Sequence, residues 1–216
     1  MTIAVLTPMA NPTVEAEFRA LLPRDFSWVT GRLVSAEPDP LQRLIAYAEG
    51  ISGSLRQFDT MKLAAVAFAC TGSSYLIGRA REEELASQLP VPVLWAAAII
   101  RERLAALGAR RIAVISPYPS NLHDAGLTYW REAGFEVIHD ARVEIGSSDT
   151  RAIYALGAAA AVEALARAVE ARPDAVLLSG TGMPSLSLVS AESTPPILSS
   201  NLCLGEAMVA AAGDGA

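Results

Sequence analysis

Short apolar runs alternate along the chain with longer segments whose apolar residues recur at helical spacing. The runs predict buried strands, and the segments between them predict helices. In the first half of the chain, strands are expected near residues 2–7, 26–34, 64–69 and 92–95. Helices are expected near residues 13–22, 39–57, 74–89 and 96–107.

The second half follows the same order. Its strands are expected near residues 111–116, 135–139, 174–179 and 196–199. Its helices are expected near residues 120–133, 149–171 and 201–211. Strands that alternate with helices of this length predict parallel sheets with crossover helices, which is an α/β fold.

The two halves also share sequence. Residues 65–74 match residues 175–184, so that Cys70 corresponds to Gly180 at an offset of 180 − 70 = 110 residues. Residues 3–9 match residues 112–118 at nearly the same offset. A series of matches in one order indicates a duplicated lobe. We therefore predict two pseudo-two-fold-related Rossmann-like lobes, with a cleft between them, over residues 1–110 and 111–216.

Composition narrows the class of protein. The chain is 52% hydrophobic and 19% charged, but alanine supplies much of the apolar share, and charges interrupt the longest apolar stretch. No run reaches the roughly 20 apolar residues of a membrane-spanning helix. The amino terminus lacks the basic segment of a signal peptide, so we predict a cytoplasmic protein. A net charge of −6 without a basic cluster argues against nucleic-acid binding.

The cysteines and histidines give no framework for a disulfide or a metal. Cys70 and Cys203 are expected to be reduced in a cytosolic chain, and Cys203 is expected to be structural. His123 and His139 are not at ligand spacing with each other or with a cysteine. We expect no metal site.

Cys70 is the first candidate for chemistry. It follows a predicted strand, and the next helix is expected to start at Ser73 or Ser74. Free N–H groups at a helix start favour an anion, either a substrate carboxylate or the thiolate, and can lower a cysteine pKa from about 8.5. The alternative is a small, buried, apolar cysteine.

The second copy of the turn contains Gly180, Thr181 and Gly182. Glycines let a carboxylate approach backbone amides closely, so this turn is a candidate binding site, although it could also be a tight turn without a ligand. It does not match a dinucleotide fingerprint, because the third glycine and the downstream acid are missing. A nucleotide-binding dehydrogenase domain is therefore not favoured.

Further polar residues follow the first strand of each half. Asn11 and Tyr118 are expected at the same sheet edge as Cys70, where each could donate to a carboxylate or an enolate. Their alternative roles are helix capping for Asn11 and packing between prolines for Tyr118. Asp149 or Thr150 is expected to cap a helix.

The motifs together resemble the aspartate/glutamate racemase superfamily, in its maleate cis-trans isomerase and arylmalonate decarboxylase branch. The resemblance covers nearly the whole chain. It rests on residues 11–15, 69–73, 116–118, 179–184 and 197–201.

This resemblance implies two Rossmann-like lobes, no metal or organic cofactor, and a cysteine from each lobe beside a small carboxylate substrate. Racemases and maleate isomerases keep both cysteines, whereas arylmalonate decarboxylases keep only the second. This chain has the reverse arrangement, with Cys70 in the first lobe and Gly180 in the second. Thr150 stands where isomerases tend to carry an asparagine.

The single thiol restricts the reaction. Two-base racemisation needs an acid–base group on each face, and glycine has none. Isomerisation, in which Cys70 adds to a double bond, is favoured. Decarboxylation with Cys70 as proton donor is the alternative, followed by carboxylate binding without catalysis. We expect Cys70 and Tyr118 to be catalytic and the protein to form a homo-oligomer. The residues expected to bind the substrate are Asn11, Thr71, Gly72, Gly180, Thr181 and Gly182.

Overall fold

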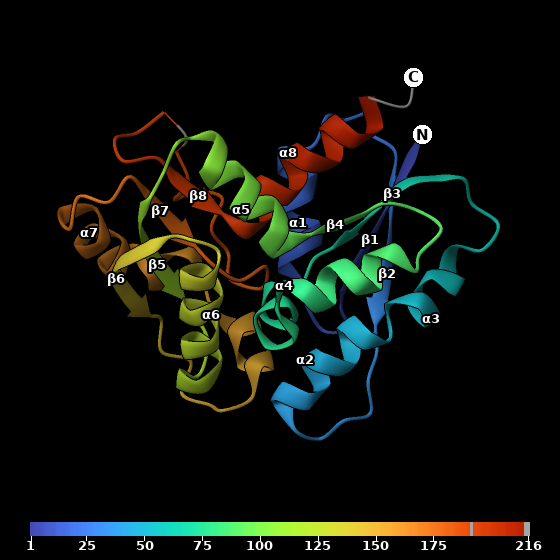
Figure 1. The fold of residues 1–216 in the computed structure, drawn as a ribbon, viewed down its shortest axis with the longest axis horizontal. Coiled ribbons are helices and arrows are strands. Elements are labelled where there is room, and N and C mark those ends of the chain that lie inside the picture. Colours follow the sequence, from blue (N-terminus) through green and yellow to red (C-terminus); the bar gives the residue numbers. More distant parts are fainter. Residues whose placement is uncertain (191, 214–216) are drawn as a thin grey trace.

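The computed structural model describes residues 1–190 and 192–213 and contains two parallel four-stranded sheets (Figure 1). The last residues of the predicted second lobe, 214–216, lie outside the described part. The first sheet has the order β2-β1-β3-β4, with β1 (Thr2–Pro8), β2 (Trp28–Leu33), β3 (Leu63–Phe68) and β4 (Val93–Trp95). The second repeats this order as β6-β5-β7-β8, with β5 (Arg111–Ser116), β6 (Glu136–Arg142), β7 (Ala175–Leu178) and β8 (Ile197–Ser199).

Helices connect the strands and cover both sheets. The first half contains α1 (Thr13–Leu21), α2 (Pro40–Glu49), α3 (Ile51–Leu55), the 3₁₀ turn η1 (Arg56–Phe58), α4 (Thr71–Ser87) and α5 (Ala96–Ala106). The second half contains α6 (Ser120–Glu132), the 3₁₀ turns η2 (Thr150–Ala155) and η3 (Ala158–Ala161), α7 (Val162–Glu170) and α8 (Ser200–Gly213). The repeated strand order confirms the predicted two-lobed α/β fold.

Three predicted helices differ from the observed ones. The single helix predicted over 149–171 is wrong, because Leu156 and Gly157 are extended and separate η2 and η3 from each other ahead of α7. The helix predicted over 39–57 is divided at Gly50, whose ψ of 7° is not helical. Helix α4 begins at Thr71, earlier than predicted, so Cys70 is its N-cap residue.

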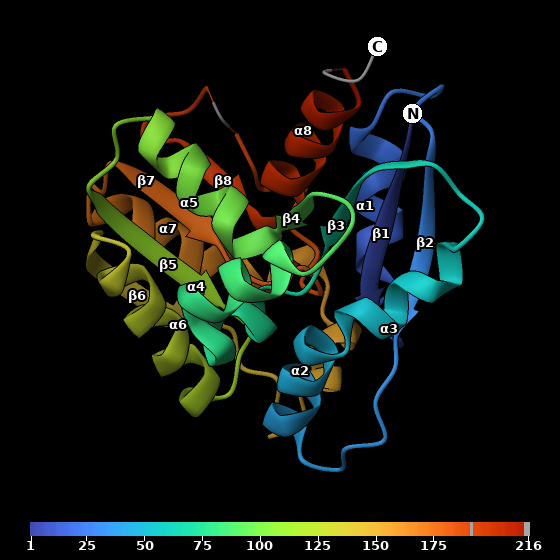
Figure 2. The same ribbon diagram turned by 45° about the vertical axis from the view of Figure 1, so that its right-hand side comes forward.

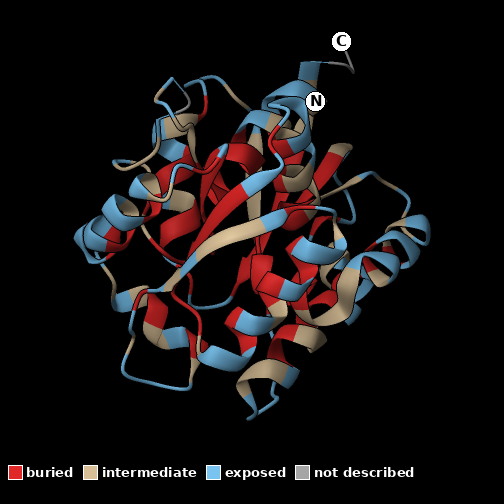
Figure 3. Ribbon diagram, turned by 60° about the vertical axis from the view of Figure 1, so that its left-hand side comes forward, coloured by how far each residue is buried: buried red, intermediate tan, exposed pale blue. Residues whose placement is uncertain are grey.

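The central strands are buried on both faces. In β1 the side chains from Ile3 to Leu6 are fully buried, and in β7 those from Ala175 to Leu178 are as well. Figure 3 shows that buried segments gather in the strands inside the molecule. Strands that are covered by helices on both sides read as continuous apolar runs, which is why the sequence located them well.

The last helix crosses from the second half to the first sheet. Leu204 and Met208 of α8 share a core cluster with Ile3 and Val5 of β1. Both ribbon views show α8 beside α1 and β4, and α5 in front of the second sheet (Figures 1 and 2). Helix α8 of the second half thus packs on the first sheet and joins the two halves. Among the described residues, no helix combines the length and the apolar character needed to cross a membrane.

Candidate active site

The turns that follow the strands of the two sheets meet between the lobes. Thr181 Oγ1 donates a hydrogen bond to the carbonyl of Ala69 at 2.8 Å, and Thr13 Oγ1 donates to the carbonyl of Gly182 at 2.8 Å. These bonds join residues 112 and 169 positions apart in the sequence. The Cys70 turn and the Gly180 turn therefore lie next to each other, at the carboxyl edges of both sheets.

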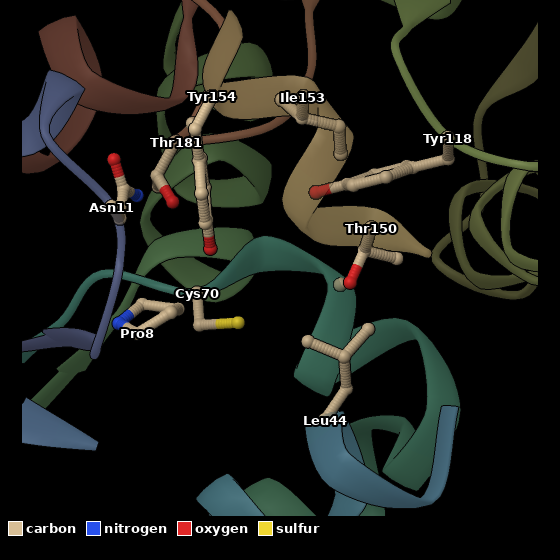
Figure 4. Close-up of a pocket in the computed structure, with 11 residues that line it drawn as sticks. Pro8, Asn11, Leu44, Cys70, Tyr118, Thr150, Ile153, Tyr154 and Thr181 are labelled. Carbon is tan, nitrogen blue, oxygen red and sulfur yellow. The ribbon is translucent and has the colours of Figure 1, made fainter. Parts of the chain in front are cut away.

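A small cavity of about 30 Å³ lies at this junction (Figure 4). Of the residues predicted for the site, those that line it are Asn11, Cys70, Gly72, Tyr118, Thr181 and Gly182. Thr71 and Gly180 are their chain neighbours but do not line the cavity. Both lobes contribute to the lining, so the cavity belongs to the predicted interlobe cleft.

The sulfur of Cys70 points into this cavity from the start of α4 (Figure 4). The residue is 4% exposed, and Ser73 Oγ lies 3.2 Å from Sγ as a donor. The same hydroxyl also lies 2.7 Å from the carbonyl of Leu44, so its single proton is shared between two acceptors. Backbone N–H groups of Gly72 and Ser73 also face the sulfur.

Burial raises the pKa of the Cys70 thiol above its ordinary value, although Ser73 and the Gly72 amide oppose this shift. The expectation that the helix start lowers this pKa is therefore wrong. The reason is that desolvation disfavours the thiolate, and no residue that lines the cavity carries a positive charge to compensate for it. Cys70 is a neutral thiol at pH 7.

A matching thiol in the second lobe would be strained. Gly180 has a φ of 109°, a conformation that favours glycine, and a Cβ atom there would lie 3.3 Å from Tyr118 Oη and 3.2 Å from Pro117 Cδ. Its N–H donates to Ser200 Oγ at 2.9 Å. A cysteine at this position would strain both the backbone and its surroundings.

The two threonine hydroxyls of the predicted site already have partners. Thr71 Oγ1 donates to Ser200 Oγ at 3.1 Å, and Thr181 Oγ1 donates to Ala69 O. The predicted role of Thr71 and Thr181 in binding the substrate stays a prediction. The backbone amides of the two turns remain as hydrogen-bond donors for a carboxylate.

Other donors face the cavity. The hydroxyls of Tyr118 and Tyr154 point inward (Figure 4). Asn11 Oδ1 accepts from the N–H of Thr13, the first residue of α1, at 2.9 Å, and Asn11 also lines the cavity. Burial raises the pKa of Tyr118 and of Tyr154, so both phenols keep their protons and can donate to an anion at neutral pH.

Sequence reasoning missed part of the lining. Asp149 caps η2 by accepting from the N–H of Arg151 at 2.9 Å, while its neighbour Thr150 lines the cavity. The sequence predicts one helix over residues 149–171, so it does not indicate that η2 turns side chains toward the cavity. The lining residues that were not predicted as site residues are Pro8, Leu44, Thr150, Ile153 and Tyr154.

A buried carboxylate of the first lobe holds the loop of the second. Glu17 on α1 is 7% exposed and accepts from the N–H of Ser185 at 2.5 Å and of Leu186 at 2.7 Å. It also accepts from Nδ2 of Asn201 at 2.7 Å, and Asn201 Nδ2 lies 3.1 Å from the carbonyl of Thr181. This network fixes the loop that follows the Gly180 turn.

The remaining titratable candidates lie away from the cavity. Cys203 is buried and does not line the Cys70 cavity, and burial raises its pKa to about 12. His123 is buried between Ser116 and Asp140, with ring nitrogens 2.7 Å and 3.0 Å from their oxygens. The described ranges contain no group of three His, Cys, Asp or Glu residues that could hold a metal ion.

The Glu17 network gives a stability prediction. We expect Glu17→Ala to lower the free energy of unfolding by roughly 2–4 kcal/mol, because buried donors without an acceptor cost about 1–3 kcal/mol each. Glu15→Ala is the matched control on the same helix. It removes a partly exposed ion pair with Arg32, which is worth about 0–1 kcal/mol. Urea denaturation measures both variants, and equal losses would contradict the prediction.

Comparison with known proteins identifies relatives of this fold. The family model of arylmalonate decarboxylase matches residues 9–215. The maleate isomerase from Pseudomonas putida S16 is 23% identical with a TM-score of 0.85, over 99% of this chain and 93% of that chain. The comparison with curated proteins gives no match.

Two further solved structures are variants with altered cysteines. One is a Nocardia farcinica maleate cis-trans isomerase variant with a covalently bound succinylcysteine intermediate; it is 20% identical, with a TM-score of 0.83 over 98% of this chain and 92% of that one. The other is a liganded arylmalonate decarboxylase in which a glycine is replaced by cysteine and a cysteine by serine. It is 25% identical, with a TM-score of 0.82 over 100% of this chain and 94% of that one.

The family match spans nearly the whole chain, and the solved structures share its two-lobed fold. Both findings confirm the branch that the sequence motifs indicated. This chain belongs to the arylmalonate decarboxylase family.

Proposed function

We propose that this chain is a cofactor-independent enzyme that decarboxylates a small dicarboxylate, with Cys70 as the proton donor. The observation that carries the proposal is a single thiol, that of Cys70, in a cavity lined by hydrogen-bond donors from both lobes. Burial raises the pKa of this thiol, which favours its role as a proton donor. Family membership supports the reaction class. One solved variant of arylmalonate decarboxylase gains one cysteine and loses another. We compare its relocated thiol with the single thiol of this chain.

Binding of the retained carboxylate needs donors and no cation. In our proposal it accepts hydrogen bonds from the amide of Asn11, the phenol of Tyr118, and the backbone amides of the two turns around Gly72 and Gly182. Fixed donors in a site of low water content stabilise negative charge strongly, because they do not have to reorient. Gly180 contributes by bringing its turn close to Tyr118.

The other carboxylate is the one that leaves. Pro8, Leu44 and Ile153 form the apolar part of the lining, and a carboxylate held against them is poorly solvated. Loss of carbon dioxide moves this charge away from the apolar residues and onto the part of the substrate that the hydrogen-bond donors hold. The C–C bond breaks, its electron pair remains on the substrate as an enediolate, and the Cys70 thiol donates a proton to the α-carbon. The resulting thiolate then regains a proton from water.

A second candidate is cis-trans isomerisation, which the sequence alone favoured. It is supported by the Nocardia farcinica isomerase variant, whose structure holds a covalently bound succinylcysteine. In this chain the thiolate would add to the double bond, assisted by Ser73 and the amide of Gly72. Decarboxylation is preferred because burial without a neighbouring cation keeps Cys70 protonated, as a proton donor must be, whereas addition to a double bond needs the thiolate. Racemisation lacks a second acid–base group, since Gly180 supplies none.

Three sequence predictions form part of the proposal. The lobes are residues 1–110 and 111–216, the enzyme acts in the cytoplasm, and it forms a homo-oligomer. The first is supported by the position of residue 110 between α5 and β5.

The reaction is tested by a substrate panel in deuterated water, read by NMR. The panel contains substituted malonates, maleate, and amino and hydroxy acids. We expect a malonate to lose carbon dioxide and to gain one deuterium at its α-carbon. Cys70→Ala should lower the rate at least 100-fold, as is typical of a lost general acid, at about the lower end of the 10²–10⁴ range. Cys203→Ala is the matched control and should keep the activity.

Unchanged turnover by Cys70→Ala would contradict the proposal. Conversion of maleate to fumarate without decarboxylation would favour the second candidate. The proton arrives from the first lobe, so the product should have the opposite hand to that of decarboxylases with a second-lobe thiol.

The pH dependence distinguishes the two roles of Cys70. A proton donor must be a thiol, and its raised pKa keeps it protonated through the neutral range. We therefore expect kcat/KM to be flat near neutral pH and to fall only above the ordinary thiol pKa of about 8.5. A nucleophilic thiolate would instead make kcat/KM rise over the same range. Initial rates between about pH 6 and pH 10 measure the profile.

A further inference from the structure

The cavity beside Cys70 is small for a substituted diacid. A single water needs about 10–15 Å³ on the same measure, so a cavity of about 30 Å³ holds only two or three water-sized groups. A larger cavity of about 330 Å³ lies next to it, lined in part by Arg43, Tyr47 and Arg151. The larger space is therefore adjacent to the reacting sulfur but separate from it.

Tyr154 is the residue that the two linings share among the described residues. It comes from η2, and its hydroxyl points toward the sulfur of Cys70 (Figure 4). The ring therefore lies as a partition between the inner cavity at Cys70 and the outer cavity.

Gly182 fixes the position of this ring. A Cβ atom on Gly182 would lie 2.7 Å from Cε1 and 3.0 Å from Cδ1 of Tyr154, closer than real contacts allow. The tyrosine ring thus occupies the space that a side chain at position 182 would need. This contact joins η2 to the turn of the second lobe and keeps the ring over the inner cavity.

The outer cavity has the size and the chemistry to take a bulky group. Arg43 and Arg151 both bond to Asp149, with Arg43 Nη2 2.7 Å from Oδ1 and Arg151 Nε 3.0 Å from Oδ2. These bonds hold the guanidinium groups in place, and a planar guanidinium can stack on an aromatic ring. An aryl substituent would fit this surface if the partition were absent.

We propose that Tyr154 is a specificity-determining residue. Its ring closes the Cys70 cavity and restricts the substrate to diacids with a small α-substituent, such as a methyl group, and it excludes aryl-substituted malonates. This inference rests on the proposed function, because it takes the Cys70 cavity as the substrate site. The proposed substrates of this chain therefore differ from the arylmalonates after which its family is named.

Calorimetric titration with methylmalonate and phenylmalonate tests the inference on the folded protein. All variants carry Cys70→Ala, which slows turnover of the diacids, and the native enzyme in this test is the one that keeps Tyr154. The native enzyme should bind methylmalonate at least about 100-fold more tightly than phenylmalonate, which is within the range for steric exclusion by a pocket. Tyr154→Ala joins the two cavities and should reduce this preference at least about tenfold. Tyr154→Phe is the matched control. It keeps the ring and should leave the preference within about threefold of the native value.

An unchanged preference in Tyr154→Ala, or equal binding of both diacids by the native enzyme, would overturn the inference and leave the proposed function intact. Tyr154→Leu provides the same test with a side chain that still covers Gly182, should the alanine variant not fold. Binding of neither diacid by the native enzyme would overturn the proposed function, and the inference with it.

Discussion

The close approach of two strand-end turns is the constraint on which the site depends. Thr181 Oγ1 and Thr13 Oγ1 each donate across the lobes at 2.8 Å, to the carbonyls of Ala69 and Gly182. Glu17 adds hydrogen bonds to two backbone amides of the loop that follows. These groups are buried, so a change in the distance between the lobes would leave polar atoms unpaired. The position of Cys70 relative to the opposite turn is thereby fixed.

This constraint also explains why the site is asymmetric. The duplicated halves place equivalent turns on opposite sides of one cavity, but only the first turn carries a thiol. A second thiol at Gly180 would be strained by the positive φ of the backbone and by its tight contact with the phenol of Tyr118. Burial without a neighbouring cation keeps Cys70 protonated. A single acid on one face suits one-sided protonation of a carbanion better than exchange between two faces.

The sequence predicted the elements whose signals are local. Buried strands such as β1 and β7 are continuous apolar runs, and the duplication revealed the second lobe and the turn opposite Cys70. It did not reveal η2, because the alanine-rich segment after Asp149 has helical spacing, which outweighed the single glycine at the extended break of Leu156 and Gly157. Tyr154 was missed for that reason. The partners of Glu17 lie 168 or more positions away, and the pKa of Cys70 depends on burial, so neither had a local signal.

The central claim is that the sulfur of Cys70 meets a bound carboxylate. The most direct measurement is the rate of alkylation of each cysteine by iodoacetamide at about pH 8.5, near the ordinary thiol pKa, followed by mass spectrometry with and without methylmalonate. We expect the ligand to slow the labelling of Cys70 at least about tenfold, which corresponds to a site occupied about 90% of the time. The rate for Cys203 should not change. Labelling of Cys70 at the same rate with and without saturating ligand would contradict the account.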